Sequence, residues 1–355
     1  MKEFRRYKLL CRLLSPIPGT GRHEIESIGQ EGLDWPEVFR VAGDHFVTPL
    51  LAGALESKGL FEQLPEDIRN YLDAIRQLNL ERNETLKTEL HFVIGKLNEI
   101  DVQPLLLKGA INLVTEQYPG CRDRVIGDLD LAIPEDRIKE SFQWLNKEPY
   151  RAEVAIDRAH ELGLWHHAPP LLHESLPVTI ELHRHVIGDN ARKFLPTDAT
   201  WQNSISHSLD GLSFRLPSPT DRLFHTFAHT QLQDRNHAHR RLALRPLCEF
   251  VNQRTSLAPD LDWNSIQVRL GRKHSWKLET YLLATHELFN QEPPAAISIG
   301  YGAKRRMEKI RTRIDSPKAP RFSHIFNRLK KLPHRLVTPA WYSAKFRALR
   351  RGDPW

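Results

Sequence analysis

The stretch Gly127-Asp128-Leu129-Asp130-Leu131-Ala132-Ile133 places two aspartates at alternate positions among apolar residues. In a β-strand, residues i and i+2 project from the same face, so the two carboxylates would lie side by side while the apolar residues face a core. Neighbouring carboxylates repel each other unless a cation lies between them, and hard oxygen ligands suit Mg²⁺, which also binds phosphate oxygens. Taken alone, the pattern more often marks a strand end with two solvated aspartates.

The segments on both sides of this stretch alternate between strand and helix patterns. Upstream, the run Leu105-Leu106-Leu107-Lys108-Gly109 ends in a tight-turn signal, and residues 110–118 have a helical pattern. Downstream, residues 178–183 alternate β-branched and polar side chains and include a third carboxylate, Glu181. This order predicts an α/β unit with a mixed sheet. We expect strands at 102–107, 128–133, 151–156, 162–167 and 178–183, with helices at 110–118 and 135–147.

The rest of the chain has mostly helical patterns. In the second half, the cluster Ser218-Pro219-Thr220-Asp221 is typical of a helix start. We expect helices at 35–42, 47–55, 68–97, 220–233, 240–253, 262–271 and 274–290. The predicted fold class is therefore α+β, with four regions: an N-terminal helical region (1–98), the α/β core (99–216), a C-terminal helical region (217–295) and a basic, partly helical tail (296–355).

Length and composition are those of a globular protein. The 355 residues allow two or three domains. No run of about 18 apolar residues occurs, so we expect no transmembrane segment, and the first residues lack the pattern of a signal peptide. The three cysteines, Cys11, Cys121 and Cys248, are far apart and odd in number. They offer no disulfide framework, and we expect a cytoplasmic protein.

Several of these motifs together resemble the nucleotidyltransferase superfamily that includes DNA polymerase β. Within it, the chain resembles a branch of bacterial proteins labelled uncharacterised nucleotidyltransferases. The residues that carry the resemblance are Leu106-Leu107-Lys108-Gly109, Tyr118, Arg124, Asp128-Leu129-Asp130-Leu131 and Glu181-Leu182-His183. The resemblance covers roughly residues 35–255. Two departures from the superfamily are an alanine where a serine usually follows the glycine of the turn, and a longer gap between that glycine and the first aspartate.

The resemblance implies a reaction in which a nucleoside monophosphate passes from an NTP to an acceptor, which would be a small molecule, a peptide or protein, or RNA. By resemblance, Asp128 and Asp130 bridge two Mg²⁺ ions (or Mn²⁺), and Glu181 binds the metal nearer the acceptor. Glu181 is also a candidate general base, because like charges and partial burial raise the pKa of a carboxylate. Removing one of the repelling aspartates should leave stability near that of the wild type.

Four further residues are candidates for nucleotide binding. Lys108 and Gly109 would hold the phosphates, through a point charge and close backbone approach respectively. Arg124 would either contact phosphate or pair with Asp128. His183, two residues after Glu181, shares its face of the strand.

Two other functions remain open. Loss of the serine after Gly109 is compatible with a catalytically inactive binding or scaffold protein that keeps the fold. His225 and His229, spaced i and i+4, have a zinc-ligand spacing that would suit a hydrolase. Position 226 is threonine, so the pair does not form the metalloprotease motif.

The tail carries most of the positive charge. Residues 304–351 contain 16 Lys and Arg against Glu308 and Asp315, whereas the whole chain has a net charge of +7, so the remainder is net acidic. An acidic body argues against a grip on nucleic acid. Apolar residues at 322, 325, 326 and 329 fit one helix face. The tail would therefore either dock on the body as a helix with a solvated basic side or bind an anionic surface or an acidic partner. In the second case we expect it to localise the enzyme or recruit its acceptor and not to be needed for the chemistry.

Overall fold

The computed structural model describes residues 3–22, 26, 34–115, 120–147, 149–153, 155–156, 166–173 and 178–316. The helices are α1 (Glu3–Leu14), α3 (Trp35–Asp44), α4 (Thr48–Ser57), η2 (Phe61–Gln63), α5 (Glu66–Asn98), α6 (Lys108–Val114), α7 (Gly120–Asp123), η3 (Glu135–Arg137), α8 (Ile138–Leu145), α10 (Asp189–Arg192), α11 (Thr197–Gln202), α12 (Pro219–Ala228), η4 (His229–Gln233), α13 (Asn236–His239), α14 (Leu244–Ser256), η5 (Ala258–Asp260), α15 (Trp263–Phe289) and α16 (Tyr301–Ile314). The strands are β1 (Leu105–Leu106), β2 (Asp128–Ala132), β3 (Tyr150–Ala152), β4 (Leu171–His173), β5 (Thr179–His183), β6 (Ile205–Leu209) and β7 (Leu212–Leu216).

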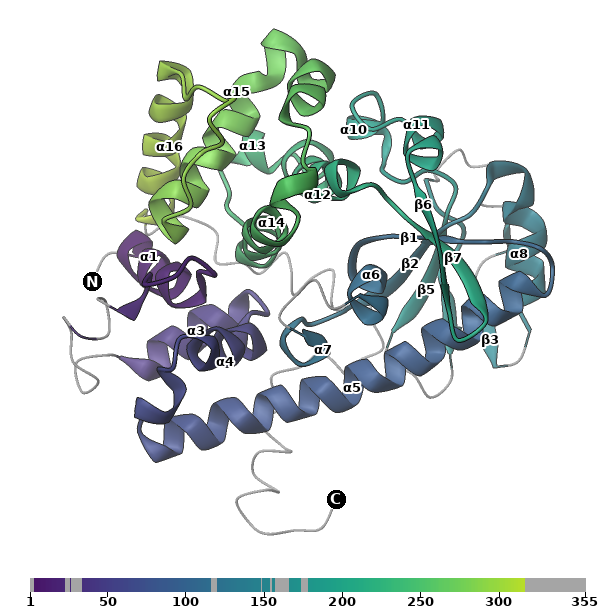
Figure 1. Cartoon of the computed structure of the whole chain (residues 1–355), viewed down its shortest axis with the longest axis horizontal. Coiled ribbons are helices and arrows are strands. Elements are labelled where there is room, and N and C mark those ends of the chain that lie inside the picture. Colours follow the sequence, from purple (N-terminus) through teal and green to yellow (C-terminus); the bar gives the residue numbers. More distant parts are fainter. Residues whose placement is uncertain are drawn as a thin grey trace.

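The strands form one mixed, seven-stranded sheet in the order β3-β4-β5-β2-β1-β7-β6. The acidic strand β2 lies near the middle, parallel to β5 and antiparallel to β1. Its apolar residues Leu129 and Leu131 are fully buried, as the alternation predicts. The α+β fold class is confirmed, and Figure 1 shows the sheet on one side of the molecule with most helices on the other.

The hairpin β6–β7 was missed by the sequence-based expectation. Its two-residue turn is Asp210-Gly211, and both residues have positive φ angles of 51° and 79°. This is the conformation of a type I′ turn, for which Asp-Gly is a favoured sequence. Asp-Gly between alternating apolar residues was therefore the signal that should have predicted the two strands.

Other predicted strands are shorter than expected. Of the strand predicted at 102–107, only β1 (Leu105–Leu106) is formed. The strand ends there because Lys108 adopts a left-handed backbone conformation and begins α6. The strand predicted at 162–167 falls mostly outside the described residues, and within them His167 forms an isolated bridge with His183. Of the helix predicted at 110–118, residues 116–119, which include Tyr118, also lie outside the described part.

Helix α5 is the longest element and contacts both halves of the molecule (Figure 1). Its second half packs against the sheet through fully buried Leu86, Leu90, Ile94 and Leu97, in a core that also contains Leu129. Its first half lies against α4 and α7. Burial of each large apolar side chain stabilises the fold by about 1.5–3 kcal/mol. The helix predicted at 68–97 is thus the element that joins the sheet to the helical region.

A second core is built by helices from both ends of the chain. Leu10 of α1, Leu51 of α4, Phe227 of α12 and Tyr281 of α15 are all buried in it. The N-terminal and C-terminal helical regions therefore share one hydrophobic core. The division into four regions stays a prediction.

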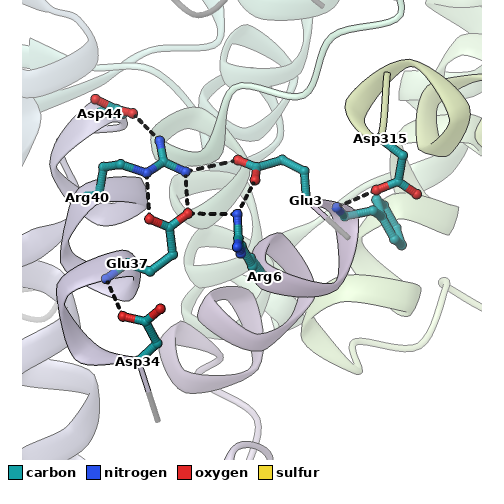
Figure 2. A network of polar contacts seen from close by, with 8 residues as sticks. Glu3, Arg6, Asp34, Glu37, Arg40, Asp44 and Asp315 are labelled. Carbon is teal, nitrogen blue, oxygen red and sulfur yellow. Dashed lines mark hydrogen bonds and ion pairs between the residues drawn. The ribbon is translucent and has the colours of Figure 1, made fainter. Parts of the chain in front are cut away.

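A network of ion pairs joins α1 and α3 at the surface (Figure 2). The guanidinium of Arg40 donates to Glu37 at 2.8 Å, to Asp44 at 2.9 Å and to Glu3 at 3.2 Å. The backbone amide of Phe4 donates to Asp315 just after α16. Exposed pairs contribute below about 1 kcal/mol each, so the network fixes the position of α1 more than it stabilises the fold.

The start of the basic tail belongs to the helical core. Helix α16 packs on α15, and Ala303, Met307 and Ile310 are buried between them and α1. The apolar positions 322 to 329 lie outside the described residues. Among the described helices, none has both the length and the apolar character needed to cross a membrane.

Deletion of residues 304–355 should destabilise the protein more than deletion of residues 317–355. The longer deletion removes Met307 and Ile310 from the core, which would cost about 1.5–3 kcal/mol for each side chain. Urea denaturation of both truncated proteins, followed by circular dichroism, measures the difference. Equal midpoints would show that α16 does not contribute to the core.

Candidate active site

The pairing of β2 with β5 brings the acidic residues together. The parallel register places Asp130 beside Glu181 and Ala132 beside His183. Nε2 of His183 lies 2.7 Å from Oδ1 of Asp130 and 3.6 Å from Oε2 of Glu181. One potential ligand atom from each of these three residues lies within 4.8 Å of the other two. Three residues that the sequence analysis selected from two separate motifs therefore form one cluster.

Asp130 is the fully buried centre of this cluster. Burial alone would raise the pKa of its carboxyl, but the ammonium of Lys108 and the hydrogen bond from His183 outweigh burial and hold that pKa well below its usual range. The second carboxylate oxygen, Oδ2, is buried and has no hydrogen-bond partner among the described residues. A buried, ionised carboxylate with an unoccupied oxygen is a suitable ligand for a further cation or proton donor.

Asp128 lies two residues earlier on the same strand and is partly exposed. Its pKa is raised to about 6, mainly by the negative charge of Asp130 and then by burial. This repulsion is the effect expected for two carboxylates on one strand face. The ammonium of Lys108 therefore does not fully offset the repulsion between the carboxylates of Asp128 and Asp130.

The pKa of Glu181 is lowered, whereas the sequence-based expectation was a raised pKa. Burial and the charge of Asp130 raise the pKa of its carboxyl, but the imidazole of His183, 3.6 Å away, and the charge of Lys108 offset this, and the net direction is downward. Cationic neighbours, which could not be placed from the sequence, decide the result. Glu181 is therefore ionised at neutral pH, and its side chain is 20% exposed.

Lys108 projects into the cluster from the turn after β1. Its Nζ donates to Oδ1 of Asp130 at 2.6 Å. Its backbone has a positive φ of 45°, which costs a non-glycine residue about 1–2 kcal/mol. Burial would lower the pKa of Lys108, yet the carboxylates of Asp130, Asp128 and Glu181 raise it. The strained turn is maintained by this ion pair and by the hydrogen bond from the Leu107 amide to the Asp130 carbonyl, 3.0 Å long.

Gly109 and Arg124 are linked to each other. A Cβ atom on Gly109 would lie 2.5 Å from Nη1 of Arg124 and 3.0 Å from Cγ2 of Ile126. The buried guanidinium of Arg124 donates to Glu249 of α14 at 2.8 Å. Arg124 therefore connects the segment before β2 to the C-terminal helices, and Gly109 leaves space for it.

Further histidines surround His183. The rings of His166 and His167 have centroids 5.6 Å and 5.3 Å from its ring. Nε2 of His225 donates to the carbonyl oxygen of Val186 at 2.8 Å, so this nitrogen carries the proton. His229 lies 3.6 Å from Asp234. In the described part of the chain, the potential metal-ligand group contains neither His225 nor His229, which leaves the zinc hydrolase hypothesis without support.

A cleft of about 800 Å³ opens directly beyond the ends of β2 and β5. Its lining includes Pro134 and Glu135 after β2, Arg184 and His185 after β5, and Trp201 of α11. The sequence analysis did not select Arg184 or His185, although both directly follow the Glu-x-His motif. The cleft carries both signs of charge, because Arg184 and Arg192 lie in its lining together with Glu135, Asp136 and Asp198.

The sequence profile of the family described as uncharacterised nucleotidyltransferase matches residues 31–290. The chain belongs to this family. The resemblance inferred from the Lys-Gly turn, the acidic strand and the Glu-x-His strand is thereby confirmed for this nucleotidyltransferase family member. Comparison with curated proteins and with solved structures gave no match.

Replacement of Gly109 by alanine should destabilise this nucleotidyltransferase by about 1–3 kcal/mol, the usual cost of overpacking. The added methyl group would collide with Arg124, whose buried pair with Glu249 prevents it from moving away. Gly127→Ala is the matched control, because a Cβ there meets no atom within 4 Å. Thermal denaturation measures both variants, and a Gly109→Ala protein as stable as the control would contradict the packing argument.

Proposed function

We propose that this protein transfers a nucleoside monophosphate from an NTP to an acceptor hydroxyl or similar group. The observation that carries the proposal is the convergence of Asp130, Glu181 and His183, with Asp128 beside them, on a strand pair that follows a lysine-containing turn. Family membership supports the same general activity. The acceptor is a small molecule, a peptide or protein, or RNA.

The cluster has the donors for a divalent cation. Asp130, Glu181 and His183 would hold it, with Asp128 as an additional oxygen ligand. The fit rests on the unpartnered Oδ2 of Asp130 and on the repulsion that raises the pKa of Asp128. Oxygen donors favour Mg²⁺, and the imidazole nitrogen makes Mn²⁺ a second candidate. A divalent ion held there would stabilise charge on the phosphate oxygens during displacement at the α-phosphorus.

Lys108 is the proposed phosphate-binding residue of the chain. Its ammonium lies 2.6 Å from Asp130 and its side chain is partly exposed, so it would contact the β- or γ-phosphate as a point charge. Gly109 would act indirectly, by allowing Arg124 to pack, and Arg124 would position the acidic strand through Glu249. His183 would hold the carboxylates of Asp130 and Glu181 in place.

Glu181 is the proposed residue on the acceptor side. It is more exposed than Asp130 and is ionised, so it can accept a hydrogen bond from an incoming hydroxyl. Its lowered pKa makes it better suited to orienting that hydroxyl than to removing its proton at neutral pH.

Asp128→Asn should reduce NTP-dependent pyrophosphate release at least about 100-fold, the scale of losing one electrostatic contact to the transition state. Stability should stay equal or rise, because the repulsion from Asp130 is removed. Asp130→Asn should be both inactive and less stable by about 3–5 kcal/mol, since Lys108 and His183 lose their buried counter-charge. This differs from the sequence-based expectation that either variant would stay near wild-type stability.

The assay supplies each NTP labelled at the α-phosphate, with Mg²⁺ or Mn²⁺, to the purified protein plus cell extract. Asp73→Asn on the exposed face of α5 is the control for loss of one negative charge. Full activity in the Asp128→Asn protein would refute the proposed active site.

Glu181→Gln should lower kcat by about 100-fold while the KM for the NTP changes less than about threefold, the pattern of a contact made mainly in the transition state. Steady-state kinetics with varied NTP measures both constants. Intact turnover would place the third carboxylate elsewhere; Glu153 would be tested next, whereas Asp157 lies outside the described residues.

A nucleotide-binding protein without turnover is the second candidate. The observation in its favour is that the ammonium of Lys108 already neutralises Asp130 within the cluster. NTP binding in calorimetry, together with no labelled product from any extract, would favour this candidate over the enzyme.

A further inference from the structure

A group of cationic side chains gathers on the helices that follow the acidic site. We call it the basic surface, and its members are Lys193, Arg235, Arg240, Lys273, Lys277 and Arg306. They come from the end of α10, both ends of α13, the middle of α15 and α16. Residues distant in sequence are thus brought together by the packing of these helices.

Trp276 of α15 lies at the centre of this group. The guanidinium carbon of Arg306 lies 5.6 Å from the ring centre of Trp276, and Nζ of Lys277 lies 5.9 Å from it. The ring of His237 packs against the same indole, with centroids 5.9 Å apart. Arg306 also donates to the carbonyl oxygens of His237 and Ala238, which attaches α13 to α16. The cations are therefore held on a defined framework.

Carboxylates do not neutralise this charge. Within the part of the chain that the structure describes, Lys193, Arg235, Arg240, Lys273 and Lys277 form no ion pair with an acidic residue. Other cations of the same two long helices do: Arg269 pairs with Asp221, and Arg311 pairs with Glu287.

The cations of the basic surface repel one another instead. Partial burial and the neighbouring Lys193 lower the pKa of Lys277, and partial burial and Arg240 lower that of Arg306. Repulsion of this kind is relieved when an anion binds.

The basic surface is connected to the acidic site through α12 and η4. Helix η4 contacts both α10 and α13 and starts at His229. The ring of His229 lies beside that of His225, with centroids 6.0 Å apart, and His225 donates to the carbonyl oxygen of Val186, three residues after His183. Six residues after His229, Arg235 begins the basic surface.

We propose that the basic surface binds the phosphate backbone of a single-stranded nucleic acid. Several separated cations around an indole ring suit a chain of phosphates with stackable bases. Nearby on α16, the 79%-exposed ring of Tyr301 precedes Lys304 and Arg305 by one helical turn, which extends the same combination. A membrane would require a continuous apolar face, whereas Val268 and Tyr301 are the large apolar side chains that the described parts of α15 and α16 expose.

Binding by this surface does not depend on catalysis. The additional hypothesis that the bound strand is the acceptor of the nucleoside monophosphate rests on the proposed function. The net acidity of the chain outside residues 304–351 does not oppose the proposal, because the structure concentrates unpaired cations on one face.

The test uses the full-length protein and fluorescein-labelled RNA and DNA strands of about 16 nucleotides, the upper site size of a single-strand-binding domain. Fluorescence anisotropy gives the affinity between about 0.05 and 0.2 M salt. The triple variant Lys193→Gln/Lys273→Gln/Lys277→Gln is compared with a control of equal charge change, Lys8→Gln/Lys96→Gln/Lys139→Gln. In the control, Lys8 of α1 and Lys139 of α8 are exposed and Lys96 of α5 is half-buried.

The triple variant of the basic surface should bind about 10- to 100-fold more weakly than wild type, and its salt slope should fall by about 2, since each lost phosphate contact removes about 0.7. The control should bind like wild type. The proposal is overturned if wild type does not bind either strand, if both triple variants bind equally, or if phosphatidylglycerol vesicles bind more tightly and displace the strands. Asp128→Asn should bind the strands normally, which separates failure of this inference from failure of the proposed function.

Discussion

The ionised carboxylate of Asp130, fully buried in the middle of the sheet, is the constraint on which the site depends. A buried charge is costly unless cations and hydrogen bonds compensate it. Here the ammonium of Lys108 and the imidazole of His183 supply the compensation from two other elements, at 2.6 and 2.7 Å. The positive φ of Lys108 and the register between β2 and β5 bring these two groups to Asp130. The same arrangement leaves Oδ2 of Asp130 without a hydrogen-bond partner among the described residues.

Buried polar contacts around α5 hold the acidic strand in position. Arg76 binds Asp123 through Nε at 2.6 Å, and Asn83 donates to the carbonyl oxygen of Arg124 at 2.7 Å. Arg124 then reaches Glu249 on α14. The segment that leads into β2 is thus fixed on one side by the longest helix and on the other by the C-terminal helices. A change in any of these residues should act on the site through position, not through direct contact with substrate.

Paired and unpaired charge have different roles in the C-terminal helices. Arg269 and Arg311 are matched by acidic residues and hold helices together. The cations around Trp276 have no acidic partner among the described residues, and burial together with neighbouring cations lowers the pKa of Lys277 and Arg306. The net charge of a whole region hides this difference, because it averages paired and unpaired groups. A chain whose body is acidic overall therefore still carries a group of cations without acidic partners among its described residues, on α10, α13, α15 and α16.

The sequence by itself determined the acidic strand, the long helix α5, the α+β class and the identity of the residues that meet at the site. These features follow from the local periodicity of the sequence, which determines which residues share a face of a helix or strand. Asp128 and Asp130 share a face because the side chains of a strand alternate with a period of two. The hairpin at Asp210-Gly211 could also have been predicted from its turn sequence, although it was missed. Tertiary structure alone decided the partners. In the folded chain, Arg124 pairs with Glu249, and the imidazole of His183 lowers the pKa of Glu181. The cations of the basic surface come from four helices. Such contacts join residues up to 125 positions apart, and no local pattern encodes which distant charge will be nearest.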